Sequence, residues 1–507
     1  MTAPQMEEAL TKIRPHTSSS LAHQKTPATL LRALEATLQE QKTEKSPTAY
    51  FASLLTTLDG TLQKKDIGLG DGDVLPAELY LLALVIPFVP PPVIRANLNT
   101  LLSLSAPLFS VLQSHAPPLR SQLTLYDWIL KSLDRSQLEA PGVRQAFASI
   151  LQLCLDPRPK VRRRAADVVK DALAAPPPPM ARHPYAERVA DWIKTCLAEV
   201  NSAVFPSKAA GKTIESPTAE TAIHILAFLR PVLLNLPPAV SILSLNLSIF
   251  TNNSSKSLPS ITNFLLTLPR LGNPYLSQSA YSILSDLFSA PAEDEASNVT
   301  DEIPAVLKAV LSSPPSKADA TLSPSWVSVL GNAMLAYSVF DPNACAAELG
   351  RVWKTVWTFL ESDHAATRKA SAESLDLLSQ CFTPDMIQFA IQETNSANAE
   401  PKSVLGSILS QADKAFGSIS FARSIPELLS VISSLIKNLR YNEGDQAVMS
   451  ADEILLLPLI RKIGDLRTDK KFEHKEAADA TLATAMRVLG PEVLLKALPL
   501  NLEPADR

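Results

Sequence analysis

Residues 143–173 read VRQAFASILQLCLDPRPKVRRRAADVVKDAL, and this stretch sets the expectation for the whole chain. Each of its halves repeats apolar side chains every three or four residues, which is the period of one helix face. The first stripe is Val143, Phe147, Ile150, Leu151 and Cys154, and the second is Val161, Ala165, Val168, Val169 and Ala172. A short proline-marked turn at residues 156–159 separates them. Two equal apolar stripes joined by a short turn predict a helical hairpin.

Two further stretches show the same design. Residues 345–381 have a turn at 362–364, and residues 261–288 have a turn at 273–274. Residues 367–372, TRKASA, can be laid on residues 161–166, VRRRAA. Weak self-similarity in units of ~40–47 residues is typical of HEAT repeats, which cannot bury their apolar stripes alone. At that period the chain would hold roughly ten hairpins.

The composition favours helices over strands. The chain has only 14 glycines but 41 prolines, whereas strands, bulges and phosphate-binding loops all draw on glycine. Apolar residues make up 46% of the chain and aromatic residues only 6%, so leucine, alanine, valine and isoleucine must build the core. The expected fold is therefore all-α, a HEAT- or armadillo-like α-solenoid superhelix.

Two regions are expected along the chain. Residues 1–26 are polar and contain three serines at 18–20, which indicates a flexible or irregular N-terminal segment. Residues 27–507 are expected to form the HEAT-repeat α-solenoid. A solenoid needs a polar terminal cap, and the final residues do not read as one. We therefore expect the N-terminal part of a longer array.

Several classes of function are disfavoured. No nucleotide-binding glycine motif is present, and the seven histidines and four cysteines are too dispersed for a metal site, so no catalytic residue, cofactor or metal ligand is assigned. The longest apolar run, residues 79–89, has about half the ~20 residues that a membrane-spanning helix needs. A net charge of −4 gives no overall attraction to nucleic acid, so any such contact must be local. We expect a non-enzymatic protein without a membrane or small-molecule partner.

One local basic cluster stands out, and two interpretations of it remain open. Six cations on two helical turns could neutralise RNA phosphates, or they could belong to a ladder of pairs between neighbouring repeats. The candidate RNA- or partner-binding residues are Arg158, Lys160, Arg163, Arg164 and Lys170, and the candidate ladder residues are Asp156, Arg162 and Arg368. No aromatic residue interrupts the cluster, so stacking of single-stranded bases is not indicated.

The run LCLDPRPKVRRRA, residues 153–165, closely resembles a segment of the ribosomal RNA-processing protein 12 family. Three other stretches agree in the same order: IRPHT at 13–17, PTAYF at 47–51, and LGPEV through LPLNL at 489–502. The resemblance spans nearly the whole chain and is closest to the N-terminal half of that family.

This resemblance implies a HEAT-repeat scaffold of small-subunit ribosome biogenesis that acts in pre-rRNA processing, pre-ribosome assembly and nuclear export. The partners it implies are assembly factors, pre-rRNA, a nuclear-transport GTPase and nucleoporins. The implied location is the nucleus and nucleolus, with shuttling to the cytoplasm left open. The alternative is a transport-receptor-like solenoid that binds a small GTPase or cargo, because fold alone does not decide function.

Overall fold

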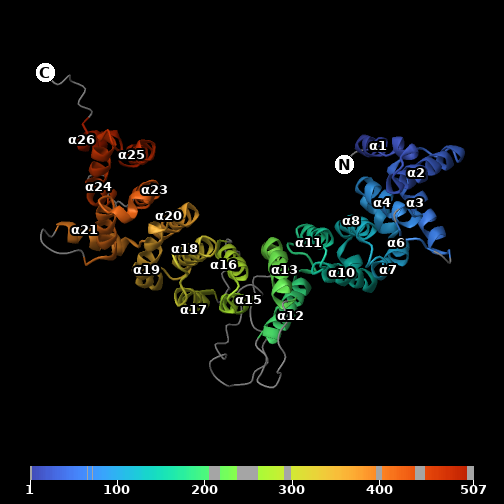
Figure 1. The fold of residues 1–507 in the computed structure, drawn as a ribbon, viewed down its shortest axis with the longest axis horizontal. Coiled ribbons are helices and arrows are strands. Elements are labelled where there is room, and N and C mark those ends of the chain that lie inside the picture. The colour runs from blue at the N-terminus through green and yellow to red at the C-terminus, as the bar shows by residue number, and fades with distance from the viewer. Residues whose placement is uncertain are drawn as a thin grey trace. The chain divides into compact units, whose positions relative to one another are not determined.

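The computed structural model describes residues 3–64, 67–70, 72–204, 217–236, 261–289, 299–395, 402–439 and 451–499. Every regular element within these ranges is a helix (Figure 1). The chain divides into two compact units, Met1–Val240 and Ser241–Arg507. Residues 500–502, at the end of the last stretch that carries the family resemblance, lie outside the described residues.

Unit 1 is a series of short and medium helices. Their bounds are α1 Ala3–Thr11, η1 Arg14–Ser18, α2 Ala22–Glu40, α3 Pro47–Leu62, α4 Val74–Val85, η2 Ile86–Phe88, α5 Pro91–Ala96, α6 Leu98–Ser105, α7 Leu108–Val111, α8 Ala116–Ser132, α9 Arg135–Leu138, α10 Pro141–Leu153, α11 Pro159–Leu173, α12 Ala186–Val204, α13 Pro217–Val232 and η3 Leu233–Asn235.

Unit 2 follows the same plan. Its helices are α15 Ile261–Thr267, η5 Leu268–Leu271, α16 Pro274–Ser289, α17 Val299–Leu311, α18 Ser323–Phe340, α19 Pro342–Trp357, η6 Thr358–Glu361, α20 Ala365–Ser379, α21 Pro384–Asn395, α22 Val404–Ala415, η7 Ile419–Ser424, α23 Ile425–Asn438, α24 Ala451–Thr468, α25 Lys475–Leu489 and α26 Pro491–Ala497.

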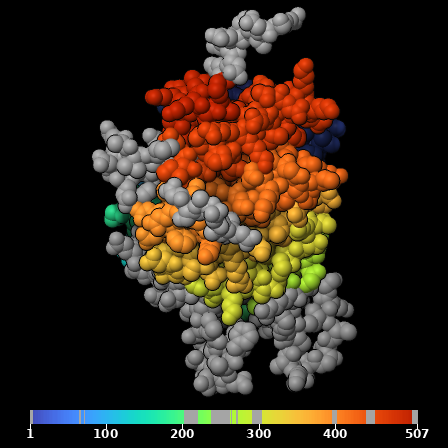
Figure 2. Space-filling model, turned by 90° about the vertical axis from the view of Figure 1, so that its left-hand side faces the viewer, coloured from blue at the N-terminus to red at the C-terminus, as the bar shows by residue number. Residues whose placement is uncertain are grey.

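Each unit consists of two layers of helices. We call the second helix of each pair the B helix; these are α2, α4, α8, α11 and α13 in unit 1, and α16, α18, α20, α23 and α25 in unit 2, and consecutive B helices pack side by side. The first helices of the pairs, such as α3, α10, α17 and α19, pack behind them as the second layer. Figure 2 shows the pairs of unit 2 layered in chain order, from yellow to red. The predicted all-α, HEAT-like arrangement is confirmed.

The three hairpins predicted from apolar periodicity are all present. They are the pairs α10–α11, α19–α20 and α15–α16, and the predicted turns join them. In the first hairpin, Phe147 and Ile150 of α10 and Val161 and Val168 of α11 are fully buried. The apolar stripes therefore face each other, as the sequence predicts.

The N-terminal segment differs from the expectation. Within residues 1–26, predicted as flexible or irregular, α1 and η1 form and α2 already begins at Ala22. Met6 and Leu10 of α1 are 1% and 0% exposed, and α1 packs against α4 while η1 packs on α2. The polar run at residues 18–20 covers only the last residue of η1 and part of the link to α2, and the apolar residues before it supply a buried face.

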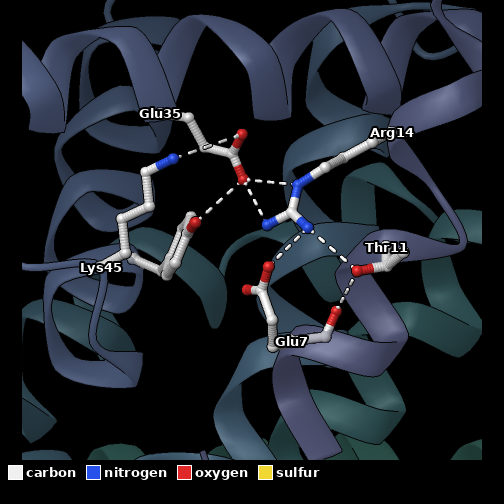
Figure 3. Close-up of polar contacts among 6 residues, drawn as sticks. Glu7, Thr11, Arg14, Glu35 and Lys45 are labelled. Atoms are coloured by element: carbon white, nitrogen blue, oxygen red, sulfur yellow. Dashed lines mark hydrogen bonds and ion pairs between the residues drawn. The ribbon is translucent and has the colours of Figure 1, made fainter. Parts of the chain in front are cut away.

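A polar cluster fixes this segment to α2 and α3 (Figure 3). The guanidinium of Arg14 donates to Glu35 Oε1 at 2.8 and 3.0 Å, and pairs with Glu7 Oε1 at 2.6 Å. The Tyr50 hydroxyl donates to the same Glu35 oxygen at 2.9 Å. The hydrogen bond from Arg14 holds the pKa of Glu7 below its ordinary value. Burial, aided by Glu35, raises the pKa of Tyr50. Residues of α1, η1, α2 and α3 thus share one cluster.

One described stretch, Ile419–Asn438, has the length and apolar composition of a membrane-spanning helix. It comprises η7 and α23, and 56% of its apolar window is buried. Helix α23 packs between α20 and α25, with Leu428 and Leu435 fully buried. This burial is what the core helix of a helical stack requires.

Candidate nucleic-acid interface

The turn before α11 is fixed by Asp156. One carboxylate oxygen accepts the backbone N–H of Arg158 at 2.8 Å and its Nε–H at 2.9 Å, and the other accepts from its terminal nitrogen at 2.8 Å. Burial opposes ionisation of Asp156, but the hydrogen bonds from Arg158 outweigh it and lower the pKa. Pro159 then occupies the first turn of α11, where its missing N–H costs nothing. Arg158, predicted as a contact residue, therefore stabilises the turn in which it lies.

Arg162 also binds this turn. Its guanidinium donates to the backbone carbonyls of Asp156 and Pro157, at 2.7 and 3.2 Å. The side-chain ladder predicted for Asp156 and Arg162 is therefore corrected: the carboxylate binds Arg158, and Arg162 binds carbonyl oxygens within its own repeat. These carbonyls belong to the turn between α10 and α11, so Arg162 ties the start of α11 to the turn that precedes it.

Arg368 occupies the equivalent position in α20. It donates to the carbonyls of Ser362 and Asp363, at 3.1 and 3.0 Å, which are six and five residues earlier, as in the Arg162 case. In addition, its Nε donates to Glu427 of α23 at 3.2 Å. Arg368 therefore makes the contact between neighbouring B helices that a ladder residue was expected to make, as well as the local one.

Arg164, another candidate contact residue, lies on α11 and contacts α8. Its guanidinium donates to Thr124 at 3.1 Å and to Asp127 at 2.9 Å. Lys131 pairs with the other oxygen of Asp127 at 2.8 Å and with Asp171 at 2.9 Å. Burial would lower the pKa of Lys131, but its two carboxylate partners raise it. We call Asp127, Lys131, Arg164 and Asp171 the α8–α11 network.

The remaining predicted contact residues lie on the surface. Lys160, Arg163 and Lys170 are exposed, and within the described ranges none of them has a hydrogen bond or ion pair. Their spacing, with the exposed Asp167 between them, is i, i+3, i+7 and i+10, which places all four on one helix face. We call Lys160, Arg163 and Lys170 the α11 cations. They span about 15 Å along the helix axis.

Sequence reasoning missed the contribution of α8. Arg120, Thr124, Trp128 and Lys131 lie at i, i+4, i+8 and i+11, which is one face of α8 beside α11. The ammonium of Lys131 lies 5.4 Å from the centre of the Trp128 ring. Most of the remainder of α8 is buried. A stripe of mostly polar residues on an otherwise apolar helix was the sequence signal that could have revealed this second side of the surface.

The described residues offer no metal site. Within the placed part of the chain, no three histidine, cysteine, aspartate or glutamate side chains are grouped so that they could hold a metal ion. Cys154, Cys345 and Cys381 are buried free thiols. Burial raises the pKa of Cys154 well above its ordinary value, which disfavours the nucleophilic thiolate.

Two family models match the chain. "RRP12-like, N-terminal HEAT repeats" matches residues 9–295, and "Ribosomal RNA-processing protein 12, HEAT repeats" matches residues 361–507. The basic run of α11 therefore lies within the first match.

Relatives match over almost the full chain. Ribosomal RNA-processing protein 12 of Saccharomyces cerevisiae is 24% identical over 517 residues, covering 98% of this chain and 40% of the relative. RRP12-like protein of Homo sapiens is 24% identical over 503 residues, covering 96% and 34%. Among solved structures, importin beta is similar with a TM-score of 0.42 and 14% identity, covering 95% of this chain and 57% of that chain.

The chain thus spans 40% or less of the length of these two relatives. The first family model alone covers more than half of the chain, the second covers most of the remainder of unit 2, and the structure shows the helix pairs that both describe. The chain therefore belongs to the RRP12-like family of HEAT-repeat proteins.

Proposed function

We propose that this chain is a non-catalytic scaffold of small-ribosomal-subunit biogenesis, and that it contacts pre-ribosomal RNA through the α11 cations. Family membership supports a role in ribosomal RNA processing, which the names of the relatives state for those proteins. The observation that carries the RNA contact is the exposure of Lys160, Arg163 and Lys170 on one face without internal partners in the described ranges.

The charge arrangement is suited to phosphate binding. Asp127 and Asp171, the acids of the α8–α11 network, are paired with Arg164 and Lys131. Their charge is therefore neutralised internally, and only Asp167 shares the exposed face with the three cations. Exposed cations release counterions when they contact phosphates, and this favours binding at low salt.

The protein partners in this proposal are assembly factors of the pre-ribosomal particle. Helix pairs that each bury only one face leave long surfaces available to such partners. Action during pre-rRNA processing, assembly and nuclear export would place the protein in the nucleus and nucleolus.

The test is RNA binding across a salt series. The wild-type chain is compared with a Lys160→Gln, Arg163→Gln, Lys170→Gln triple variant on structured pre-ribosomal RNA. Loss of three phosphate contacts should weaken binding and reduce the slope of log affinity against log salt by about 2 to 3.

The matched control removes three cations from exposed B-helix positions in unit 2. It is Lys369→Gln, Lys437→Gln, Arg487→Gln, which changes the net charge by the same amount. This control should bind nearly as the wild type does. Equal loss in both variants would mean that only net charge matters. If the wild-type chain does not bind RNA, the RNA contact is contradicted and the transport-receptor alternative is favoured. That alternative predicts binding to a small GTPase whose affinity changes with the nucleotide bound to the GTPase.

A further inference from the structure

We infer that the surface formed by α8 and α11 binds single-stranded RNA, with Trp128 stacking on a base and the α11 cations contacting phosphates. This inference rests on the proposed RNA contact and specifies the class of RNA. It concerns the stripe of α8 that is not fully buried, namely the exposed Arg120 and the half-buried Thr124, Trp128 and Lys131, together with the α11 cations.

Trp128 differs from the other tryptophans of the chain. Trp326, Trp353 and Trp357 are at most 1% exposed and each contacts another aromatic ring, and Trp192 contacts Phe228. Trp128 is half-buried and has no aromatic ring against it among the described residues. The part of this indole that reaches the surface is available for stacking on a base.

The α8–α11 network fixes where the indole lies. Lys131 contacts the Trp128 ring and is itself held by Asp127 and Asp171, while Arg164 holds Asp127 and Thr124. Thr124 and Trp128 are one turn apart on α8. The ring is therefore positioned on the surface at the α8–α11 boundary before any ligand arrives, which lowers the entropy cost of binding.

The surface faces outward because the other sides of both helices are covered. Helix α8 is flanked by α4 and α11 with α5 behind it, and α11 is flanked by α8 and α13 with α10 behind it. Neighbouring packed helices lie about 8–10 Å apart, so one strand of RNA can touch the cations of α11 and the ring on α8 together. The basic run contains no aromatic residue in the sequence, but helix packing supplies one from α8.

Base stacking distinguishes single strands from duplexes. The bases of a duplex already stack on one another, whereas a single strand exposes the faces of its bases to aromatic side chains. Phosphate contacts alone act on both forms. A surface with a positioned indole beside unpaired cations should therefore prefer a single strand over a duplex with the same number of phosphates.

The test compares binding of an oligouridine single strand and an RNA duplex of equal phosphate count. Trp128→Leu keeps an apolar side chain but removes the aromatic face, and should weaken single-strand binding about tenfold while leaving duplex binding unchanged. Trp128→Phe should restore most of the loss. Trp192→Leu, the same change on α12 of the other layer, is the matched control and should leave both affinities unchanged. Hydrogen exchange of α8 and α11 verifies folding.

The outcomes separate the two proposals. Suppose that the Lys160→Gln, Arg163→Gln, Lys170→Gln variant binds neither RNA, but Trp128→Leu still prefers the single strand. Stacking by Trp128 is then refuted, and the phosphate contact stands. If Trp128→Phe fails to restore binding while the fold is intact, stacking is likewise refuted. If the wild type binds neither RNA, both proposals fail.

Discussion

Two boundaries between B helices, α8–α11 in unit 1 and α18–α20 in unit 2, are held together in different ways. In unit 1, α8 and α11 are connected by ion pairs, from Arg164 through Asp127 and Lys131 to Asp171. In unit 2, α18 and α20 are in close backbone contact, because a Cβ added at Gly331 would lie 2.9 Å from the Cα of Ser374. Ser374 also donates to the carbonyl of Val327 at 3.1 Å.

This difference affects what each surface can bind. The ionic boundary of unit 1 neutralises the local acids and leaves the α11 cations exposed beside it. The next boundary of unit 2, between α16 and α18, carries small neutral groups, namely the hydrogen-bonded pairs Ser282–Ser325 and Asn332–Ser285. Unit 1 thus presents exposed cations beside an ion-paired boundary, whereas these two boundaries of unit 2 present small neutral side chains.

Removal of the shared acid should have the largest effect. Asp127→Ala leaves Arg164 and Lys131, whose side chains are 26% and 25% exposed, without their common partner. We expect a loss of about 3 kcal/mol in the local stability of α8 and α11, because breaking a buried pair leaves uncompensated charge. Hydrogen exchange of these helices measures the loss. Asp167→Ala on the exposed face is the control and should leave the local stability almost unchanged. If α8 and α11 are equally protected from exchange in the two variants, the network is not stabilising.

A pH series tests another buried acid of the B layer in unit 1. Burial raises the pKa of Glu78 to about 7, against the opposing effects of the hydrogen bond from Thr61 and the charge of Lys64. Its folded-state pKa exceeds the unfolded value of 4.5, so its contribution to stability is full below pH 4.5 and is lost as pH rises through 7. The expected loss around α4 is about 3 kcal/mol, because each unit of pKa difference corresponds to about 1.4 kcal/mol. Glu78→Gln should abolish this dependence in hydrogen exchange corrected for intrinsic rates; an unchanged profile would exclude Glu78 as its source.

The close contact in unit 2 can be broken with one methyl group. Gly331→Ala must separate α18 from α20 or shift Ser374, and should cost about 2 kcal/mol, as overpacking in a core does. Gly60→Ala in α3 is the control, because nothing lies within 4 Å of its added Cβ, and a helical alanine should stabilise by up to about 1 kcal/mol. Local exchange of α20 and of α3 measures both effects. Tolerance of the methyl group at 331 would mean that the boundary adjusts.

The smallest effect should separate two equivalent arginines. Arg162→Ala and Arg368→Ala each remove the same two bonds to turn carbonyls, but only Arg368 also contacts Glu427. We expect Arg368→Ala to be more destabilising by about 1 kcal/mol, the usual contribution of a charged hydrogen bond. Exchange of the two turns gives the difference. In a Glu427→Gln background, the difference between Arg368→Ala and Arg162→Ala should be smaller. If the two alanine variants lose the same stability in the wild-type background, the contact between Arg368 and Glu427 adds nothing to stability.

Apolar periodicity was sufficient to predict the helix pairs and their turns, because buried stripes must repeat with the helix period. It could not separate Arg163 from Arg164, which differ by about 100° around α11. Whether the second faces solvent depends on Asp127, 37 residues away on another helix. The N-terminal helices were not predicted, because the segment is polar on average and has only two large apolar residues, Met6 and Leu10, to mark the buried face of α1. Partners that are distant in sequence decide the surface, and periodicity does not contain them.

The polar cluster of Glu7, Arg14, Glu35 and Tyr50 has a practical consequence for shortened forms of the protein. Arg14 and Tyr50 bind one oxygen of Glu35, and η1 packs on α2. Truncation ahead of α2 would leave Glu35 without its arginine and uncover apolar surface. Because helix stacks with an uncovered terminal face tend to associate, such a fragment should self-associate more strongly than the intact chain.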